Sequence, residues 1–293
     1  MSNNLEHNVF ERIAVALEGI LEELKKRNTI EDVEDDELFK NLELPDDFDW
    51  LEEKDAVTLN IQEFLKQKGY DVFCCTFIED VDPTMLMIAN SIGRSYSLVE
   101  PFILEIKRNI DKPNQFTMRL RKYGQRAVCA ICGLATMLKE NKLLRYYSYR
   151  KAPEYLLIAK PENIGNIHNF YTGQWLEYYV ANMVKTVLEN RDGHKSVNLN
   201  IKVKNRNFVE FEFDVMATLN DEIFWIECKT GEYKKHLPKY KKLARELDIP
   251  SNRMFLVVAG IDDETAKFLS NAHDITICSV ENFKSVFEKS LEA

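Results

Sequence analysis

A pair of strand-like segments joined by a tight turn constrains the fold of the C-terminal half most strongly. Residues 207–219 contain a stretch, 209–215, in which acidic and apolar side chains alternate, residues 222–229 are mostly apolar, and an Asn-Asp pair at 220–221 separates them. This alternation and these turn residues predict an antiparallel β-hairpin. Folding about the turn pairs residues whose numbers sum to about 441, which places Asp214 opposite Glu227.

The two predicted strands carry charged residues on faces that the hairpin brings together. Side chains alternate across a strand, so Glu227 and Lys229 point to one face while Ile226 and Cys228 point to the other. On the preceding strand the same rule separates an acidic face from an apolar face: Glu210, Glu212 and Asp214 against Phe211, Phe213 and Val215. An exposed strand can also carry charges by chance, but acids would then tend to face bases.

The facing carboxylates of Asp214 and Glu227 predict a metal site. Two like charges opposite each other on neighbouring strands repel by up to about 1 kcal/mol. A divalent cation removes this penalty, and hard carboxylate oxygens suit Mg²⁺ or Mn²⁺.

A helix predicted over residues 172–189 supplies a third carboxylate. At about 100° per residue, its apolar side chains fall in one arc, and Glu177 lies inside that arc. A carboxylate directed at the core needs a partner, and a metal ion or another cation would serve. The apolar residues of the arc are Leu176, Val180, Met183, Val184, Val187 and Leu188.

The elements after residue 161 predict a mixed sheet flanked by helices. Their order is α-β-β-β-α-β-α-β-α, which is typical of an α/β domain, here assigned to residues 161–293. After the first helix, strands are expected at 196–204, 207–219, 222–229, 253–259 and 274–280, and helices at 238–247, 263–271 and 281–291.

Residues 1–55 form a separate segment, in which apolar residues repeat with helical spacing over 5–27. The segment holds 18 acids and 6 bases, a net charge of −12. Its acidic stretch at 31–55 is interpreted as a solvated linker or short helix. The other interpretation is a nucleic-acid mimic that occupies a basic surface and restrains an enzyme.

Residues 56–160 form a smaller mixed α/β region with 10 acids and 16 bases, a net charge of +6. Its last part has the strand–helix–hairpin order of a winged helix. The alternative is a packing or dimerisation module with solvated arginines. The bases that would form a basic face are Arg119, Arg121, Lys122, Arg126, Arg145, Arg150 and Lys151.

Three motifs resemble the PD-(D/E)xK, or restriction-endonuclease-like, superfamily of nucleases. They are G-Q-W-L-E-Y-Y-V at 173–180, F-D-V at 213–215 and I-E-C-K-T at 226–230. More narrowly, they are similar to the nuclease domain of CRISPR ancillary nucleases, which is linked there to a CARF domain. The resemblance covers roughly residues 166–290, and no CARF domain is recognisable in the preceding residues.

The resemblance implies a metal-dependent nuclease that cleaves DNA or RNA in defence against foreign nucleic acid, and it implies a homodimer. Asp214 and Glu227 would coordinate Mg²⁺ or Mn²⁺ together with the backbone carbonyl of Cys228, and Glu177 would complete the metal shell. Lys229 would orient or deprotonate the attacking water and stabilise the charge at the phosphorus. Near a bound cation the pKa of Lys229 is expected to be lowered.

A basic segment after the third strand is the predicted nucleic-acid contact. Residues 232–242 (EYKKHLPKYKK) hold six basic residues, five lysines and one histidine, which would neutralise phosphates. Several superfamily members carry Q-x-x-x-Y on this helix. Here the spacing runs from His236 to Tyr240, and Pro238 is expected to leave His236 ahead of the first turn. Nucleic-acid binding is assigned to Lys234, Lys235, Lys239, Tyr240 and Lys241.

The chain has no run of about 18 apolar residues and does not begin with the layout of a signal peptide. We therefore expect a cytoplasmic protein without a membrane partner, with six reduced and buried cysteines. The alternative function is a non-catalytic nucleic-acid-binding or regulatory protein on the same scaffold. That alternative predicts a damaged metal set, whereas the set of acids and lysine is complete.

Overall fold

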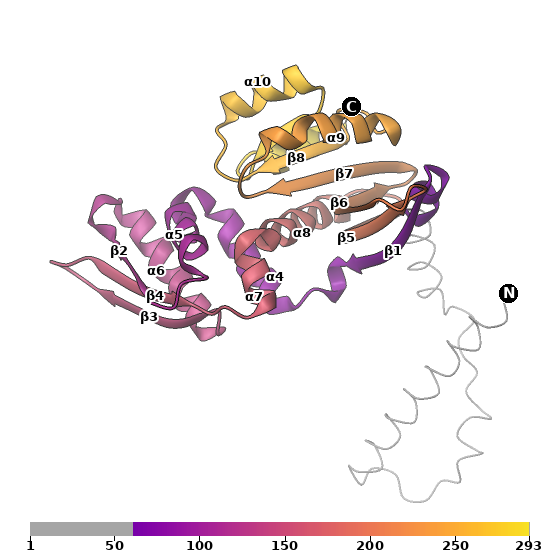
Figure 1. Ribbon diagram of the computed structural model, residues 1–293. Coiled ribbons are helices and arrows are strands. Elements are labelled where there is room, and N and C mark those ends of the chain that lie inside the picture. Colours follow the sequence, from indigo (N-terminus) through magenta and orange to yellow (C-terminus); the bar gives the residue numbers. More distant parts are fainter. Residues whose placement is uncertain (1–60, 293) are drawn as a thin grey trace, which may run out of the picture. The chain divides into compact units, whose positions relative to one another are not determined.

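In the computed structural model, which describes residues 61–292, a mixed six-stranded sheet forms the larger layer (Figure 1). β1, β5, β6 and β7 pair antiparallel, whereas β8 pairs in parallel with β7 and β9 in parallel with β8. This confirms the predicted mixed sheet. The strand order is β1 (Tyr70–Phe77), β5 (Lys195–Asn205), β6 (Glu210–Leu219), β7 (Glu222–Lys229), β8 (Met254–Val258) and β9 (Thr276–Ser279).

Helices cover both faces of this sheet (Figure 1). One face packs against α8 (Trp175–Glu189) and α11 (Phe283–Ser290). The other packs against α9 (Leu237–Glu246), α10 (Asp263–His273) and the helical residues 61–67. Because β7 is covered on both sides, its side chains from 223 to 226 are all buried, which explains its continuous apolar run.

The strand at Tyr70–Phe77 belongs to this larger sheet, although the sequence grouped it with residues 56–160. It pairs antiparallel with β5, from Tyr70 opposite Asn205 to Phe77 opposite Asn198. Strand pairing between distant segments depends on tertiary contacts, and residues 70–77 carry no sequence signal for their partner. The predicted helix at 5–27 and the acidic stretch at 31–55 lie outside the described residues.

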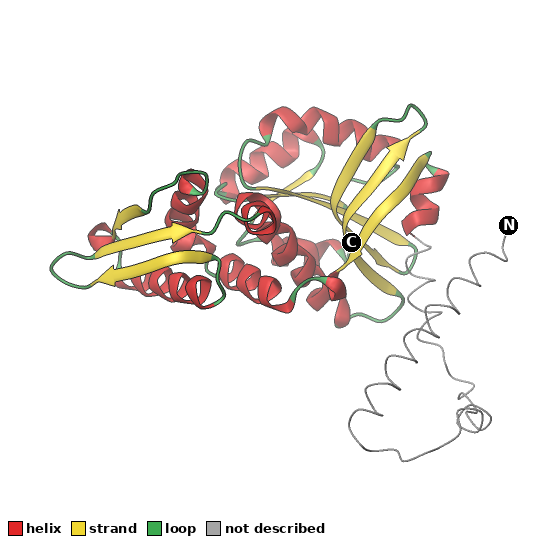
Figure 2. Cartoon of the chain, turned by 60° about the horizontal axis from the view of Figure 1, so that its bottom comes forward, coloured by secondary structure: helices red, strands yellow, loops and turns green. Residues whose placement is uncertain are grey.

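A second, three-stranded antiparallel sheet lies in the middle of the chain (Figure 2). Its order is β2 (Phe116–Arg119), β4 (Leu156–Pro161) and β3 (Leu144–Arg150). The helices α5 (Tyr96–Asn109) and α6 (Gln125–Glu140) pack against it. The strand–helix–hairpin order is thus present, and a single α-helix, preceded by a 3-10 turn at Leu120–Lys122, separates β2 from β3.

The helix α4 (Pro83–Arg94) connects the two sheets through its packing against α8. Its start is well defined, because the Asp82 side chain accepts hydrogen bonds from two backbone N–H groups and Pro83 occupies the first turn. Before α8 the chain forms α7 (Gly165–Asn169) and a π-helical turn at Phe170–Gln174.

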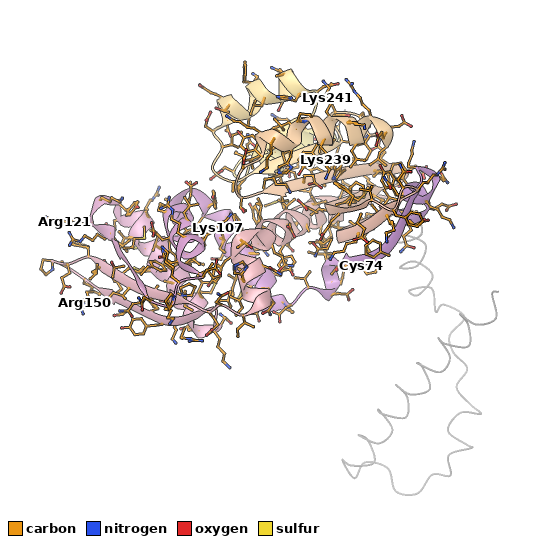
Figure 3. The ribbon with its side chains drawn as sticks, viewed as in Figure 1. Cys74, Lys107, Arg121, Arg150, Lys239 and Lys241 are labelled. Atoms are coloured by element: carbon orange, nitrogen blue, oxygen red, sulfur yellow. The ribbon has the colours of Figure 1, made fainter. Side chains whose placement is uncertain are left out.

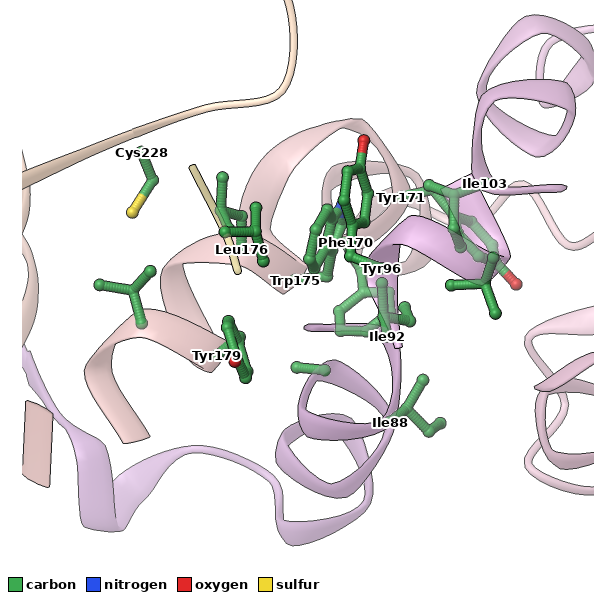
Figure 4. Close-up of a cluster of buried hydrophobic side chains, with 14 of the residues drawn as sticks. Ile88, Ile92, Tyr96, Ile103, Phe170, Tyr171, Trp175, Leu176, Tyr179 and Cys228 are labelled. Atoms are coloured by element: carbon green, nitrogen blue, oxygen red, sulfur yellow. The ribbon is translucent and has the colours of Figure 1, made fainter. Parts of the chain in front are cut away.

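Close packing among α4, α5 and α8 builds a shared aromatic core (Figure 4). The rings of Tyr96 and Trp175 stack with centroids 5.3 Å apart. Gly93 on α4 lies directly against Tyr179 on α8, and a Cβ added at Gly93 would lie 2.3 Å from that ring. The glycine therefore sets how closely the two helices approach.

The cysteines are only partly as expected. None of the six forms a disulfide, and Cys228 and Cys278 are buried, but Cys74 and Cys129 are exposed. Cys129 lies on the solvent side of α6, so the apolar run around it is not buried on all faces. No helix among residues 61–292 is long and apolar enough to cross a membrane.

Substitution of Gly93 by alanine is expected to lower the free energy of unfolding by about 1 to 3 kcal/mol, because the new methyl group overpacks the contact with Tyr179. Gly133 is a matched control, since it is exposed within α6 and has no atoms near an added Cβ. There, alanine should stabilise by up to about 1 kcal/mol through helix propensity. Urea unfolding of both variants measures the contrast, and equal effects would contradict the close approach.

Candidate functional site

The hairpin of β6 and β7 has the predicted register. Val215 pairs with Ile226, and the ladder continues to Leu219 opposite Glu222. The β6–β7 ladder ends at Val215, and beyond it side-chain carboxylates instead of backbone carbonyls accept the hydrogen bonds of the backbone N–H groups. The backbone N–H of Cys228 donates to Oδ2 of Asp214 at 2.8 Å, and the N–H of Asp214 donates to Oε1 of Glu227 at 3.4 Å.

The ammonium group of Lys229 lies among three oxygen atoms at this end of the hairpin. Its Nζ is 3.0 Å from Oδ2 of Asp214 and 3.4 Å from Oε2 of Glu227. It also donates to the backbone carbonyl of Cys228 at 3.0 Å. A cation is therefore held by two carboxylates and one carbonyl at the positions where the sequence predicted a metal ion.

The alternation of β6 breaks beside Asp214, which the sequence pattern did not predict. Phe213 packs in the core cluster under α9, whereas Val215 packs in the cluster under α8. The strand β5 bends at the same level, because Asn200, between the pairs Leu199–Val215 and Ile201–Phe213, has a φ of 52°. The predicted shared face of Phe211, Phe213 and Val215 is thus wrong for Val215.

Glu227 is the most buried acid of the site, with an exposed fraction of 2%. The indole Nε1 of Trp225 donates to its Oε1 at 3.0 Å, and the Tyr240 hydroxyl is also hydrogen-bonded to it. Burial and the nearby Asp214 carboxylate raise the pKa of Glu227 to about 7, against the lowering effect of Lys229.

Glu177 lies in the first turn of α8, and its carboxylate is close enough to those of Asp214 and Glu227 to be repelled by them. Burial raises the pKa of Glu177 to about 8, with Asp214 as the next largest cause. Its side chain also lines a pocket of about 480 Å³ together with Gln174, Lys202 and Glu212. Within residues 61–292 no hydrogen bond or ion pair joins the Glu177 carboxylate to another group.

The pKa of Lys229 is raised, in contrast to the lowering expected near a bound cation. Burial alone would lower it, but the Glu227 and Asp214 carboxylates outweigh that effect. The direction follows from the ligand set: without a divalent ion, Lys229 is the cation that compensates two acids. The expected lowering would require another cation among these oxygens.

The donor set fits an oxygen-preferring divalent ion. Asp214, Glu227 and the Cys228 carbonyl already surround a positive charge, and carboxylate and carbonyl oxygens are the ligands that Mg²⁺ and Mn²⁺ prefer. No three His, Cys, Asp or Glu side chains in the described part of the chain are close enough together to hold a metal by themselves. Glu177 would therefore have to approach, and Lys229 to move aside.

The five residues predicted to bind nucleic acid lie in different surroundings. Tyr240 is buried at the site, with its ring centroid 5.9 Å from Nζ of Lys229. Lys239 lies over the ring of Phe211 at 4.3 Å, and it shares α9 with Lys241 (Figure 3). Lys234 and Lys235 are exposed in the 3-10 turn before α9, where Lys235 pairs with Glu232.

Sequence reasoning missed a polar link between α5 and the site. Nζ of Lys107 donates to the backbone carbonyl of Thr230 at 3.1 Å and to its Oγ1 at 3.0 Å. The Thr230 hydroxyl donates to the carbonyl of Thr172 at 2.6 Å, in the π-helical turn before α8. Thr230 is the last residue of the I-E-C-K-T motif, but nothing in the sequence relates it to a lysine 123 residues away.

One family model matches part of this chain. Residues 165–275 match the family model described as "Card1-like, endonuclease domain". The match includes all four residues of the predicted site, and it confirms the resemblance to PD-(D/E)xK nucleases over this stretch. No match was found among curated proteins.

Two solved structures share the fold. Protein VC1899 from Vibrio cholerae is 18% identical, with a TM-score of 0.53 over 79% of this chain and 60% of that chain. Can2 from Sulfobacillus thermosulfidooxidans, solved in complex with cyclic tetra-adenylate, is 15% identical, with a TM-score of 0.55 over 80% of this chain and 59% of that chain. The chain thus spans about three fifths of the length of both structures, and the likeness extends beyond residues 165–275.

Replacement of Glu177 by glutamine should change how stability depends on pH. The folded pKa of about 8 exceeds the ordinary value of 4.5, so the contribution of Glu177 is fully present below about 4.5 and is lost as the pH rises through 8. In EDTA, the free energy of unfolding of the wild type should fall relative to that of Glu177→Gln between these values, by at least about 1 kcal/mol. If the free energies of unfolding of wild type and Glu177→Gln changed in parallel with pH, the raised pKa would be contradicted. The exposed Glu264→Gln is the control and should follow the wild type.

Replacement of Lys107 by methionine should loosen the loop that follows β7. Methionine keeps the apolar stem but removes two hydrogen bonds to Thr230, which are worth about 1 kcal/mol each. Backbone amides of residues 230–233 should then exchange with deuterium roughly tenfold faster or more. Exposed Lys66→Met is the control. Unchanged exchange at 230–233 would mean that Lys107 does not hold this loop.

Proposed function

We propose that this protein is a divalent-metal-dependent nuclease that hydrolyses phosphodiester bonds in DNA or RNA. The observation that carries the proposal is the position of Lys229, whose ammonium contacts Asp214, Glu227 and the Cys228 carbonyl beside the half-buried Glu177. The match of residues 165–275 to an endonuclease-domain family supports it.

Each residue of the site has a role that follows from its surroundings. Asp214, Glu227 and the Cys228 carbonyl would hold Mg²⁺ or Mn²⁺, and Glu177 would complete the shell from α8. When bound, the ion would polarise the phosphodiester and lower the pKa of water. Trp225 fixes the orientation of Glu227, because its N–H occupies Oε1 and leaves Oε2 toward Lys229.

Lys229 would act on the substrate once its oxygen partners are shared with the ion. Its ammonium then stabilises the negative charge that accumulates at the phosphorus and orients the attacking water. Tyr240, which is hydrogen-bonded to Glu227, borders the same position, and the lysines of the segment 234–241 supply positive charge along α9 and the turn before it.

The biological setting of this activity is defence against foreign nucleic acid, by likeness to the Card1-like endonuclease family and to the fold of Can2. A homodimer would place two such sites together, so that both strands of a duplex could be cut. Light scattering during size-exclusion chromatography tests the dimer directly, since a monomeric mass at micromolar concentration would remove it from the proposal.

Incubation of the purified protein with plasmid, linear duplex, single-stranded DNA and RNA tests the activity. Cleavage is expected with Mg²⁺ or Mn²⁺ and not with EDTA. Lys229→Met and Asp214→Asn should each lower the rate by about a hundredfold or more, because each removes a group that acts at the transition state. The same changes at exposed positions, Lys267→Met and Asp221→Asn, serve as controls with wild-type rates expected.

A measurement of metal binding accompanies the cleavage assay. Mn²⁺ should raise the midpoint of thermal unfolding of the wild type and not that of Asp214→Asn, because a ligand that binds the folded state stabilises it. Metal binding without cleavage of any substrate would favour a non-catalytic nucleic-acid-binding protein on this scaffold. Cleavage that survives both Lys229→Met and Asp214→Asn would contradict the assigned site.

A further inference from the structure

Four exposed bases gather at the junction of β2 and α6, outside the site described above. Arg119 ends β2, Arg121 and Lys122 lie in the 3-10 turn at Leu120–Lys122, and Arg126 lies in the first turn of α6. We call these four residues the basic edge. Across residues 61–292, none of the four is ion-paired with an acid, whereas Arg150 in the adjacent hairpin pairs with Glu154.

The smaller sheet holds the basic edge in a fixed place. Leu120 is fully buried between the bases, and its N–H donates to the carbonyl of Tyr155 at 2.8 Å. Arg119 and Arg150 pair with Leu156 from opposite sides. They therefore flank it on one face of the sheet, about 10 Å apart at two strand spacings. Figure 3 shows Arg121 and Arg150 on this module.

A pocket of about 700 Å³ adjoins the basic edge and adds groups that suit a nucleotide. The wall formed by β2 and the following turn offers a threonine hydroxyl, a tyrosine ring and three of the four bases. The opposite wall, on α5, carries two acids, of which Glu105 is paired with Arg108. The first wall is formed by Thr117, Arg119, Arg121, Lys122 and Tyr123.

The electrostatics of the basic edge are unfavourable without a partner. Residues 119–126 hold four bases and no acid. Arg126 lies in the first turn of α6, near the positive end of the helix dipole. No acidic residue and no side-chain cap in that turn offset this positive charge. Bound negative charge would relieve this repulsion. Because the bases extend along a strand, a turn and a helix, a chain of phosphates matches them better than one small anion.

We propose that the basic edge binds the phosphate backbone of nucleic acid as a second contact, separate from the candidate active site. The inference rests on the proposed function for the identity of this nucleic acid as the substrate. Contacts to phosphates carry little sequence information, so the basic edge would supply affinity and orientation rather than base recognition. It would lower the KM for cleavage and leave kcat unchanged.

Fluorescence anisotropy with labelled DNA and RNA oligonucleotides, single-stranded and duplex, tests the contact in EDTA, where no cleavage is expected. The test variant is Arg121→Glu/Lys122→Glu. Its control, Lys267→Glu/Lys289→Glu, makes the same change in net charge at exposed lysines of α10 and α11. We expect the test variant to bind at least tenfold more weakly than the wild type and the control to bind within about twofold.

The salt dependence separates a direct contact from a general effect of charge. Each lost phosphate contact should reduce the slope of log affinity against log salt by about 0.7 to 0.9. A slope that is reduced in the test variant alone, by the amount expected for one or two lost phosphate contacts, supports the proposal. Equal losses in both variants, or an unchanged slope, would overturn it. The neutral pair Arg121→Gln/Lys122→Gln, with a melting temperature matched to the wild type, excludes misfolding.

The two proposals fail in different ways. A wild type that binds nucleic acid through the basic edge but never cleaves it removes the nuclease proposal and keeps the binding surface as a nucleic-acid contact. A wild type that cleaves with metal, while Arg121→Glu/Lys122→Glu has an unchanged KM and affinity, removes the basic edge alone. A raised KM with unchanged kcat in that variant supports both.

Discussion

The ion cluster of Asp214, Glu227 and Lys229 is the interaction on which the arrangement of the site depends. At the end of the β6–β7 ladder, the two carboxylates accept backbone N–H groups that the ladder no longer pairs. Both acids are then held at low exposure, where isolated charges are very costly, and the ammonium compensates them. Removing one member would leave the others buried and uncompensated, so the cluster behaves as a unit.

The surrounding elements bury one side of this cluster and leave a pocket beside the other. Trp225 and Tyr240 pack beside Glu227 and donate to it, which fixes the direction of its carboxylate. From the other side, α8 brings Glu177 to the edge of a pocket. The link from Lys107 through Thr230 to Thr172 joins the end of β7 to the start of α8. The smaller module thereby contributes to the geometry of the larger sheet.

Local pattern was sufficient for the hairpin and for the helix that carries Glu177. The register of β6 and β7 follows from the two-residue turn between them, which depends on neighbours in sequence. The arc of α8 follows from helical periodicity: Leu176, Val180, Val184, Val187 and Leu188 are buried as it requires, and Met183 is half-buried. Local pattern failed at Val215, because the alternation of β6 breaks beside Asp214, at the level where the paired strand β5 carries Asn200 with a φ of 52°.

The sequence by itself determined the mixed α/β class, the hairpin register and the set of acids and lysine that meet at its end. These features depend on period-2 and period-3.6 patterns and on turn chemistry, which are local. Only the tertiary structure decided that β1 completes the sheet and that Lys107 holds Thr230. Those contacts join segments far apart in the chain, and their energies depend on burial and geometry that no local pattern encodes.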